Sequence, residues 1–303
     1  MNFKEQLSDN VLVIEKILDE YLPESADYQS IIMDAMKYSV KAGGKRIRPL
    51  LMHEAYNIFG GDGDVIKPFM AAIEMLHTYS LVHDDLPAMD NDEYRRGRKT
   101  THVVYGEAIG ILAGDALLNY SFETASKAFD MTDDFEMYKR ISRALRIFMT
   151  KAGIYGMIGG QTVDVCNEGR PVTREMLDFI FRLKTAALLE ASLMVGAILA
   201  GASDDDVLKI EQIGNKVGMA FQIQDDILDV IGDTNVLGKP VLSDEKNSKV
   251  TYVTLYGLNQ ASADVIRYSD EAISLIEELK QSNRINNSEF FEEIVRMLIN
   301  RDK

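Results

Sequence analysis

Two groups of aspartates are the residues of this sequence most able to do chemistry. One spans residues 84–90 (DDLPAMD) and the other residues 225–229 (DDILD), and each lies in an otherwise apolar, helical pattern. Like charges in such surroundings are costly unless a cation neutralises them. Magnesium keeps several waters and is held by one or two carboxylates together with substrate phosphates. The two groups therefore predict magnesium sites that a diphosphate ligand completes.

The second group has the spacing of one helix face. Asp225 and Asp229 are four residues apart, and Gln222 lies three residues before Asp225 on the same side. The rest of this helix is apolar, so we expect these side chains to project into a packed interior.

The first group needs a break in its helix. An unbroken helix would point Asp84 and Asp90 roughly 120° apart, which is too far for a shared ion. Pro87 disfavours helical geometry at the residue before it. We therefore expect the helix to end near Asp85 and Asp90 to return from a loop.

Other aspartate pairs in the chain illustrate the alternative interpretation, in which acidic groups are solvated helix starts. Asp133-Asp134 and residues 204–206 (DDD) precede expected helices and lack a correctly spaced acid downstream. Both are predicted to be N-terminal caps. One isolated DDxxD sequence could equally be solvated surface. Two of them in matching apolar settings, each followed by a basic loop, favour metal and diphosphate chemistry.

Basic residues that could bind phosphate accompany both groups. Residues 43–49 (GGKRIRP) place three cations on a turn that opens a helix, which is a natural phosphate site. His77 lies about two turns before Asp84 on the same helix face. The polar, basic loops 90–102 and 232–250 directly follow the aspartates, and we interpret them as lids or phosphate clamps. Further candidates are Arg95, Arg96, Lys184, Thr185, Lys239 and Lys249.

Helical periodicity dominates the elements that would position these residues. After two helices near the start, helices are expected at residues 49–59, 65–86, 104–129, 135–156, 173–199, 204–231, 261–280 and 288–299. Strand patterns of useful length are hard to find, and no linker or repeat divides the chain. We therefore predict an all-α protein with a single domain, residues 1–303.

The composition restricts the partners and the location. The 303 residues carry a net charge of −15, which disfavours nucleic acid and anionic membrane surfaces. The lone Cys166 cannot form an internal disulfide, and the polar N-terminus does not resemble a signal peptide, so we expect a cytoplasmic protein. The apolar stretch 186–202 is short and contains Glu190, so it predicts a buried central helix rather than a membrane span.

Taken together, these motifs resemble the trans-isoprenyl diphosphate synthases, also called polyprenyl synthetases, and among them the bacterial farnesyl diphosphate synthases. The resemblance covers the whole chain. In the family's order, the matching segments are GGKRIRP (43–49), HTYSLVHDDLPAMDND (77–92), RRGRKTTH (95–102), GGQ (159–161), KT (184–185), FQIQDDILD (221–229), LGK (237–239) and DEKNSKVTY (244–252). It implies a bundle of about ten or more helices around a central cavity, and a homodimer.

The resemblance also implies a role for each site residue. Isopentenyl diphosphate would be held by Gly44, Lys45, Arg48, His77 and Arg96. An allylic diphosphate, dimethylallyl or geranyl, would be bound through three magnesium ions by Asp84, Asp85, Asp90, Asp225 and, less directly, Asp229. Its leaving group would contact Arg95, Lys184, Lys239 and Lys249. Thr185 and Gln222 would lie beside the developing carbocation.

The chemistry of such a site agrees with these residue types. Breaking an allylic C–O bond leaves a diphosphate and an allylic cation, so magnesium and fixed cations must stabilise the departing oxygens. The isopentenyl double bond then attacks, and the resemblance assigns the final proton to the released diphosphate. Tyr79 and Ser80 lie about one turn before Asp84. An aromatic residue there predicts a floor for the growing chain and, by the family's pattern, a C15 product, farnesyl diphosphate.

Three alternatives remain open to different degrees. A synthase making the C20 product, geranylgeranyl diphosphate, would differ only in pocket depth. A terpene cyclase would lack the GGKRIRP site for a second diphosphate. A non-catalytic partner subunit would have lost aspartates or the Lys-Thr pair, and both are present.

Overall fold

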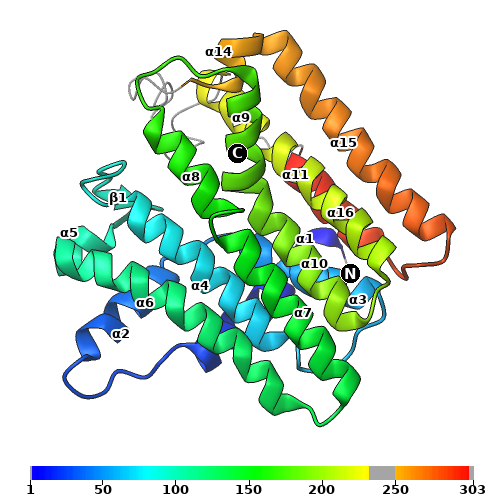
Figure 1. Cartoon of the computed structure of the whole chain (residues 1–303), viewed down its shortest axis with the longest axis horizontal. Helices are drawn as coiled ribbons and strands as arrows, with labels where there is room; N and C mark the ends of the chain where they lie inside the picture. The colour runs from blue at the N-terminus through cyan, green and yellow to red at the C-terminus, as the bar shows by residue number, and fades with distance from the viewer. Residues whose placement is uncertain (1, 232–249, 300–303) are drawn as a thin grey trace. The chain divides into compact units, whose positions relative to one another are not determined.

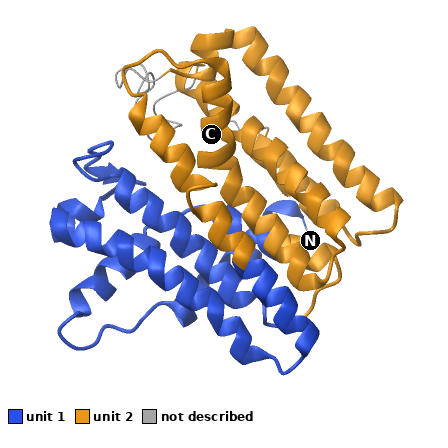
Figure 2. Ribbon diagram, viewed as in Figure 1, with its two compact units in different colours: residues 1–53, 63–145 blue, residues 54–62, 146–303 orange. Residues whose placement is uncertain are grey.

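The computed structural model describes residues 2–231 and 250–299, and in these the chain is helical with one small hairpin (Figure 1). It divides into two compact units, residues 1–53 with 63–145 and residues 54–62 with 146–303 (Figure 2). The prediction of an all-α fold is confirmed. The single domain and the central cavity stay predictions.

Unit 1 is centred on α4 (Lys67–Asp84), which lies along α6 (Glu107–Ser126). Pro68 stands in the first turn of α4, where its missing N–H costs no helical hydrogen bond, and most side chains of this apolar helix are buried. The other elements are α1 (Phe3–Tyr21), α2 (Ser30–Val40), β1 (Tyr94–Arg95), β2 (Arg98–Lys99), α5 (Thr101–Tyr105), η1 (Lys127–Met131) and the first parts of α3 (Ile47–Ile58) and α7 (Phe135–Ala152). Both aspartates of the pair at 84 and 85 therefore lie at the end of a buried helix.

Unit 2 is centred on α10 (Ala187–Ala200), in which every residue from Ala187 to Leu199 is buried. α10 packs along α11 (Asp204–Ile231), and α11 packs along α15 (Leu258–Gln281). The remaining elements are the later parts of α3 and α7, α8 (Met157–Cys166), α9 (Arg174–Ile180), η2 (Phe181–Ala186), α14 (Tyr252–Tyr256) and α16 (Glu289–Ile299). The second aspartate group thus lies near the end of a long, well-supported helix.

One helix of the described chain is long and apolar enough to cross a membrane. It runs from Arg174 to Ala200 through α9, η2 and α10, and 78% of its most apolar stretch is buried in the structure. Burial of this kind is typical of a core helix in a globular protein. The prediction of a buried helix at this place is confirmed.

Glycine explains most differences from the expected helices. The helix expected at 104–129 is split at Gly106, whose φ of 90° ends α5 and starts α6. The helix expected at 135–156 ends at Ala152, before Gly153 and Gly156, and α8 then forms although it was not predicted. Two glycines inside α8 lower its helix propensity, so tertiary packing must supply its stability.

The two aspartate groups that were predicted to be N-terminal caps both lie at helix starts. Asp134 accepts hydrogen bonds from the amides of Glu136 (3.2 Å) and Met137 (3.3 Å), which confirms its capping role. At α11 the prediction was wrong in detail, because Ser203 is the cap and accepts from the amide of Asp206 at 3.2 Å. A serine hydroxyl caps as well as an aspartate does, and the three acids instead occupy the first turn, where the helix dipole favours them.

Candidate active site

The first aspartate group lies where α4 ends. The amide of Asp85 still donates to the carbonyl of Leu81, but the chain then turns, and the amide of Asp90 donates to the carbonyl of Asp84 at 2.8 Å. The predicted break and the return of Asp90 from a loop are therefore confirmed. The turn brings Asp84 and Asp90 together although a continuous helix would separate them.

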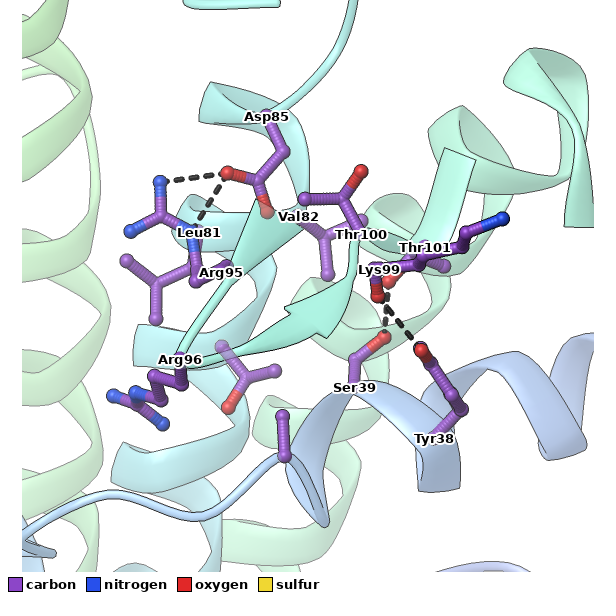
Figure 3. Close-up of a pocket in the computed structure, with 12 residues that line it drawn as sticks. Tyr38, Ser39, Leu81, Val82, Asp85, Arg95, Arg96, Lys99, Thr100 and Thr101 are labelled. Carbon is purple, nitrogen blue, oxygen red and sulfur yellow. Dashed lines mark hydrogen bonds and ion pairs between the residues drawn. The ribbon is translucent and has the colours of Figure 1, made fainter. Parts of the chain in front are cut away.

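Asp85 is the buried member of this group and forms an ion pair. Asp85 is only 4% exposed, and its Oδ1 accepts a hydrogen bond from Nε of Arg95 at 2.6 Å and lies 2.6 Å from Nη2 of the same guanidinium (Figure 3). Burial raises the pKa of the Asp85 carboxyl, and the Arg95 guanidinium opposes that rise. The pair fixes Arg95 on α4 and uses one oxygen of Asp85 inside the protein.

Arg95 and Arg96 are carried by the β1–β2 hairpin. Its two turn residues, Arg96 and Gly97, have φ of 53° and 74°, the left-handed pair of a tight hairpin turn. A positive φ is unusual for arginine and costs of the order of 1–2 kcal/mol, so this conformation must be held by its surroundings. Nη1 of Arg96 donates to the carbonyl of Gly43. Gly44 has a φ of 137°, a conformation that residues with a side chain rarely adopt, which explains the glycine beside this guanidinium.

A cationic site in unit 1 contains polar atoms that the protein does not satisfy. Among the described residues, the buried Nε of Arg48 and the buried Nδ1 of His77 have no hydrogen-bond partner. Burial and the neighbouring Arg96 lower the pKa of Arg48 to about 10. Burial and the surrounding arginines, Arg48 foremost, lower the pKa of His77 well below its usual value. A site in which cations destabilise one another and donors lack partners is suited to an anion.

Arg46 does not belong to this anion site, which corrects the view of residues 43–49 as three phosphate-binding cations. It is 2% exposed, and its guanidinium donates to Glu15 (2.6 Å), Glu74 (2.7 Å) and the carbonyl of Val40 (2.7 Å). A buried arginine needs such carboxylate partners. Sequence spacing alone could not separate it from Lys45, which is exposed.

The two residues predicted to set chain length lie on α4 in different surroundings. Tyr79 is 5% exposed and makes an edge-on ring contact with His83, with centroids 5.8 Å apart. Burial, and to a smaller extent Asp84, raise the pKa of Tyr79, so it stays neutral. The hydroxyl of Ser80 donates to the carbonyl of His77 at 2.8 Å. Tyr79 is therefore the rigid, bulky member of the pair.

The second aspartate group stays on one continuous helix, as predicted. Asp226 and Asp229 are buried, and Asp225 is half-buried. Oδ2 of Asp226 accepts from the amide of Tyr252 at 2.6 Å, and its Oδ1 accepts from Nε2 of Gln222 at 3.4 Å. Asp226 thus links α11 to the first residue of α14 rather than standing apart as a ligand.

Lys184 and Thr185 lie on η2, a π-helical turn inserted between α9 and α10. Thr185 donates to Oε1 of Gln222 at 2.8 Å, and Nζ of Lys184 is 2.6 Å from a carboxylate oxygen of Asp164. A Cβ on Gly160 would collide with the backbone of Lys184, so the GGQ glycine allows α8 to approach η2. π-helical turns are rare and often mark functional sites.

Sequence reasoning missed both the π-helical turn and Asp164. No local pattern distinguishes a π turn inside a long apolar helix. Asp164 had a usable signal, because it lies three residues after Gln161 of the GGQ motif and therefore on the same helix face. Lys239 and Lys249, which were also predicted, lie outside the described residues.

The carboxylates of the aspartate groups could supply only some of the ligands that a metal ion needs. In the described part of the chain, no three acidic, histidine or cysteine side chains converge as a complete metal site. Magnesium does not require one, because it accepts one or two carboxylates and fills its other positions with water and substrate phosphate. The donor set of hard oxygen ligands suits that ion.

Comparison with known proteins agrees with this geometry. The chain is 42% identical over 270 residues to farnesyl diphosphate synthase of Bacillus subtilis, covering 89% of this chain and 90% of the relative. It is 40% identical over 277 residues to geranylgeranyl diphosphate synthase of Cyanophora paradoxa, covering 87% and 90%. A crystal structure of geranyltransferase from Helicobacter pylori complexed with magnesium and isoprenyl diphosphate superposes with a TM-score of 0.83 at 32% identity, covering 99% and 97%.

The family model for polyprenyl synthetases matches residues 29–289, a range that contains both aspartate groups, the hairpin arginines and the π-helical turn. The chain belongs to the polyprenyl synthetase family.

Proposed function

We propose that this prenyltransferase joins isopentenyl diphosphate head-to-tail to dimethylallyl and then geranyl diphosphate, and releases (2E,6E)-farnesyl diphosphate and diphosphate. The observation that carries the proposal lies within unit 1. The carboxylates of Asp84 and Asp90 are brought together by the turn after α4 and are suited to bind a diphosphate through metal ions. Arg48 and His77 form a separate cationic site that is suited to bind a diphosphate directly. Two different diphosphate sites fit the joining of two diphosphates.

The cationic site is assigned to isopentenyl diphosphate, which keeps its diphosphate during the reaction. Arg48, His77 and Arg96 would donate to its oxygens, with Lys45 at the exposed edge and Gly44 leaving room for Arg96. The buried, unsatisfied Nε of Arg48 and Nδ1 of His77 support this assignment. Direct donors suffice here, because no bond to this diphosphate breaks.

The aspartates are assigned to the allylic diphosphate, which leaves. Magnesium, when bound, would neutralise the departing oxygens, and three ions would be shared among Asp84, Asp85, Asp90, Asp225 and Asp229. Arg95 and Lys184 would donate to the same leaving group, as would Lys239 and Lys249. The ion pairs of Arg95 with Asp85 and of Lys184 with Asp164 hold both cations in place beforehand.

Residues of the chain would then stabilise the allylic carbocation. When the allylic C–O bond breaks, its electron pair leaves with the diphosphate. The hydroxyl oxygen of Thr185 and the amide oxygen of Gln222 would face the allylic cation with their lone pairs. The isopentenyl double bond forms the new C–C bond, and the proton lost from the condensed product passes to the released diphosphate. No histidine or glutamate base is needed.

The C15 product is supported by Tyr79. Its ring is buried and rigidly packed one turn before the first aspartates, as a floor for a growing chain would be. Geranylgeranyl diphosphate is the second candidate product, because comparably similar relatives are named for each. Tyr79→Ala should therefore shift the product from C15 toward C20 and longer. Mass analysis of the products decides this, and an unchanged length would contradict the floor.

The decisive experiment for the function is incubation with isopentenyl and dimethylallyl diphosphates plus magnesium, followed by product mass analysis. We expect a C15 diphosphate. Absence of any condensation product would contradict the proposal and would favour a non-catalytic partner subunit.

We also propose that the protein is a cytoplasmic homodimer that binds neither nucleic acid nor membrane. Apolar side chains on α5 and α6 support the dimer, since Val103, Val104, Ile111 and Leu112 are between 37% and 51% exposed on these two neighbouring helices. Light scattering of the purified protein would test it. A monomer at micromolar concentration would contradict it.

A further inference from the structure

The two neighbouring arginines of the hairpin are supported in different ways. Arg95 is fixed at the end of α4 by a hydrogen bond and an ion pair with Asp85. Arg96 occupies a strained turn position, and its guanidinium reaches the carbonyl of Gly43, on the loop that precedes α3. The position of Arg96 therefore depends on how the hairpin lies against that loop.

The last turn of α2 and the residues after it contact this hairpin. The hydroxyl of Tyr38 donates to the carbonyl of Lys99 at 2.7 Å (Figure 3). The guanidinium of Arg98 stacks 4.5 Å from the centre of the Tyr38 ring, and its Nη1 donates to the carbonyl of Lys41 at 2.9 Å. We call Tyr38 and Arg98 the hairpin anchor.

Arg96 and Arg98 make equivalent contacts along the same segment. Arg98 donates to the carbonyl of Lys41 and Arg96 to that of Gly43, two residues further on. The hairpin therefore runs beside residues 41–43 and is joined to them by two arginines. Arg98 is exposed, and its guanidinium is engaged by the Tyr38 ring and the carbonyl of Lys41.

A small hollow of about 30 Å³ lies beside the hairpin, and Tyr38, Ser39, Arg96 and Thr100 are among the residues that line it (Figure 3). It is far too small for a substrate, since ligand pockets usually exceed about 300 Å³. Tyr38 of the hairpin anchor and Arg96 therefore line the same hollow, so the polar contacts of the anchor lie close to this arginine.

We propose that Tyr38 and Arg98 are positioning residues that hold Arg96 in place and so set the affinity for isopentenyl diphosphate. The inference rests on the proposed function of the cationic site. Arg96 would lose its alignment if the anchor were weakened. Arg95 would not, because Asp85 holds it separately.

Kinetics of Tyr38→Phe and Arg98→Lys test the inference. The first keeps the ring and removes the hydroxyl; the second keeps the charge and removes the planar stack and the Nη1 donor. Loss of a hydrogen bond worth about 0.5–1.5 kcal/mol should raise the KM for isopentenyl diphosphate about 2- to 10-fold. The KM for the allylic substrate and kcat should stay near the wild-type values. The double variant should raise the KM for isopentenyl diphosphate by less than the combined effect of the two single variants, because Tyr38 and Arg98 are in contact.

The matched control is Arg174→Lys in unit 2. Arg174 is likewise exposed and stacks 4.3 Å from the centre of the Tyr256 ring, so the substitution is chemically the same. It should leave both KM values unchanged. A purely structural role of the anchor would lower kcat or the unfolding temperature and leave the isopentenyl KM unchanged, and that result would overturn the inference. An equal rise of both KM values would also overturn it.

Calorimetric titration with isopentenyl diphosphate alone separates this inference from the proposed function, since it needs no turnover. If the wild-type protein binds it and the anchor variants bind it 2- to 10-fold more weakly, as expected from the loss of one hydrogen bond, the inference stands even without condensation. Wild-type affinity in both variants would refute it. A wild-type protein that makes no prenyl product would refute the proposed function instead.

Discussion

The two aspartate groups gather carboxylates in opposite ways. In unit 1, α4 ends at Asp84, and a turn closed by the backbone bond from Asp90 to Asp84 brings the third aspartate back. In unit 2, α11 continues through its aspartates, and the helix spacing alone sets Asp225 and Asp229 on one face. The first arrangement depends on a loop and its contacts, and the second depends on a helix.

In both groups, nevertheless, the second aspartate of the Asp-Asp pair is buried and bonded to another residue of the protein. Asp85 binds Arg95, and Asp226 binds the amide of Tyr252, and each residue is 4% exposed. A buried carboxylate needs such donors. The two differ in extent, because the contacts of Asp85 with Arg95 involve one carboxylate oxygen, whereas both oxygens of Asp226 accept hydrogen bonds from the protein.

The largest expected effect comes from Asp84→Ala. If Asp84 binds magnesium on the leaving diphosphate, turnover should fall by several orders of magnitude, each tenfold being about 1.4 kcal/mol of transition-state stabilisation. Steady-state assays measure it, and circular dichroism checks the fold. Asp133→Ala, in a pair that belongs to a helix start, is the matched control and should keep wild-type turnover. Wild-type turnover in Asp84→Ala would remove the basis for the metal assignment.

The second aspartate group separates the two kinds of role. Asp225→Asn should raise the magnesium concentration needed for half-maximal rate, because a ligand is weakened. Asp226→Asn should leave that concentration nearly unchanged and lower kcat instead. The side-chain NH2 of the asparagine would face another donor, either the backbone N–H of Tyr252 or the side-chain NH2 of Gln222, so one hydrogen bond would be lost. It should also cost about 1–3 kcal/mol of unfolding free energy. Equal magnesium dependence in both variants would mean that the two aspartates share one role.

A smaller effect is expected where α8 meets η2. A methyl group on Gly160 would overlap the backbone of Lys184, which cannot move aside as a flexible side chain could. Gly160→Ala should therefore destabilise the fold by about 1–3 kcal/mol and displace Lys184 and Thr185, lowering kcat. Denaturant unfolding and kinetics measure the two effects. Gly153→Ala is the control, since its methyl would meet only carbonyls of its own chain turn, the nearest at 3.2 Å.

The sequence predicted most of the elements because their apolar periodicity is strong. α11 begins and ends at the expected residues, and the end of α4 follows from Pro87. The helix end in the first aspartate group and the loop that returns Asp90 were also predictable, since both are local consequences of one proline. The breaks at Gly106 and Gly153 were missed because a helix tolerates isolated glycines.

The contacts of the candidate site could not be predicted, because they join residues distant in sequence. Nothing local distinguishes Arg46, which binds Glu74, from Arg48, whose Nε has no partner among the described residues. The same holds for the pairing of Lys184 with Asp164. Residue type gave the chemistry, and only tertiary packing assigned each charge to an ion pair or to a ligand.

The smallest expected effect is on the pH dependence of stability and concerns His77. This residue belongs to the anion site of unit 1, and no described residue of the aspartate group in unit 2 corresponds to it. Its pKa is lowered in the folded protein by burial and by Arg48, Arg96, Arg95 and Arg46. As the pH falls below the ordinary histidine pKa of about 6.5, the unfolded chain binds a proton that the folded protein does not. Stability is then lost toward acid, by at most about 1.4 kcal/mol per pH unit for this group.

His77→Gln should remove this part of the acid dependence, because glutamine does not titrate. Denaturant unfolding of both proteins between pH 7 and pH 5 measures the difference, which should grow toward pH 5 with the variant losing less stability. Bound diphosphate should shrink the difference, since an anion beside His77 favours the protonated ring and raises its pKa toward that of the unfolded chain. Parallel pH profiles without ligand would show that the pKa of His77 is the same in the folded and the unfolded chain. The cationic surroundings inferred for His77 would then be wrong, and with them the anion site that distinguishes the first aspartate group from the second.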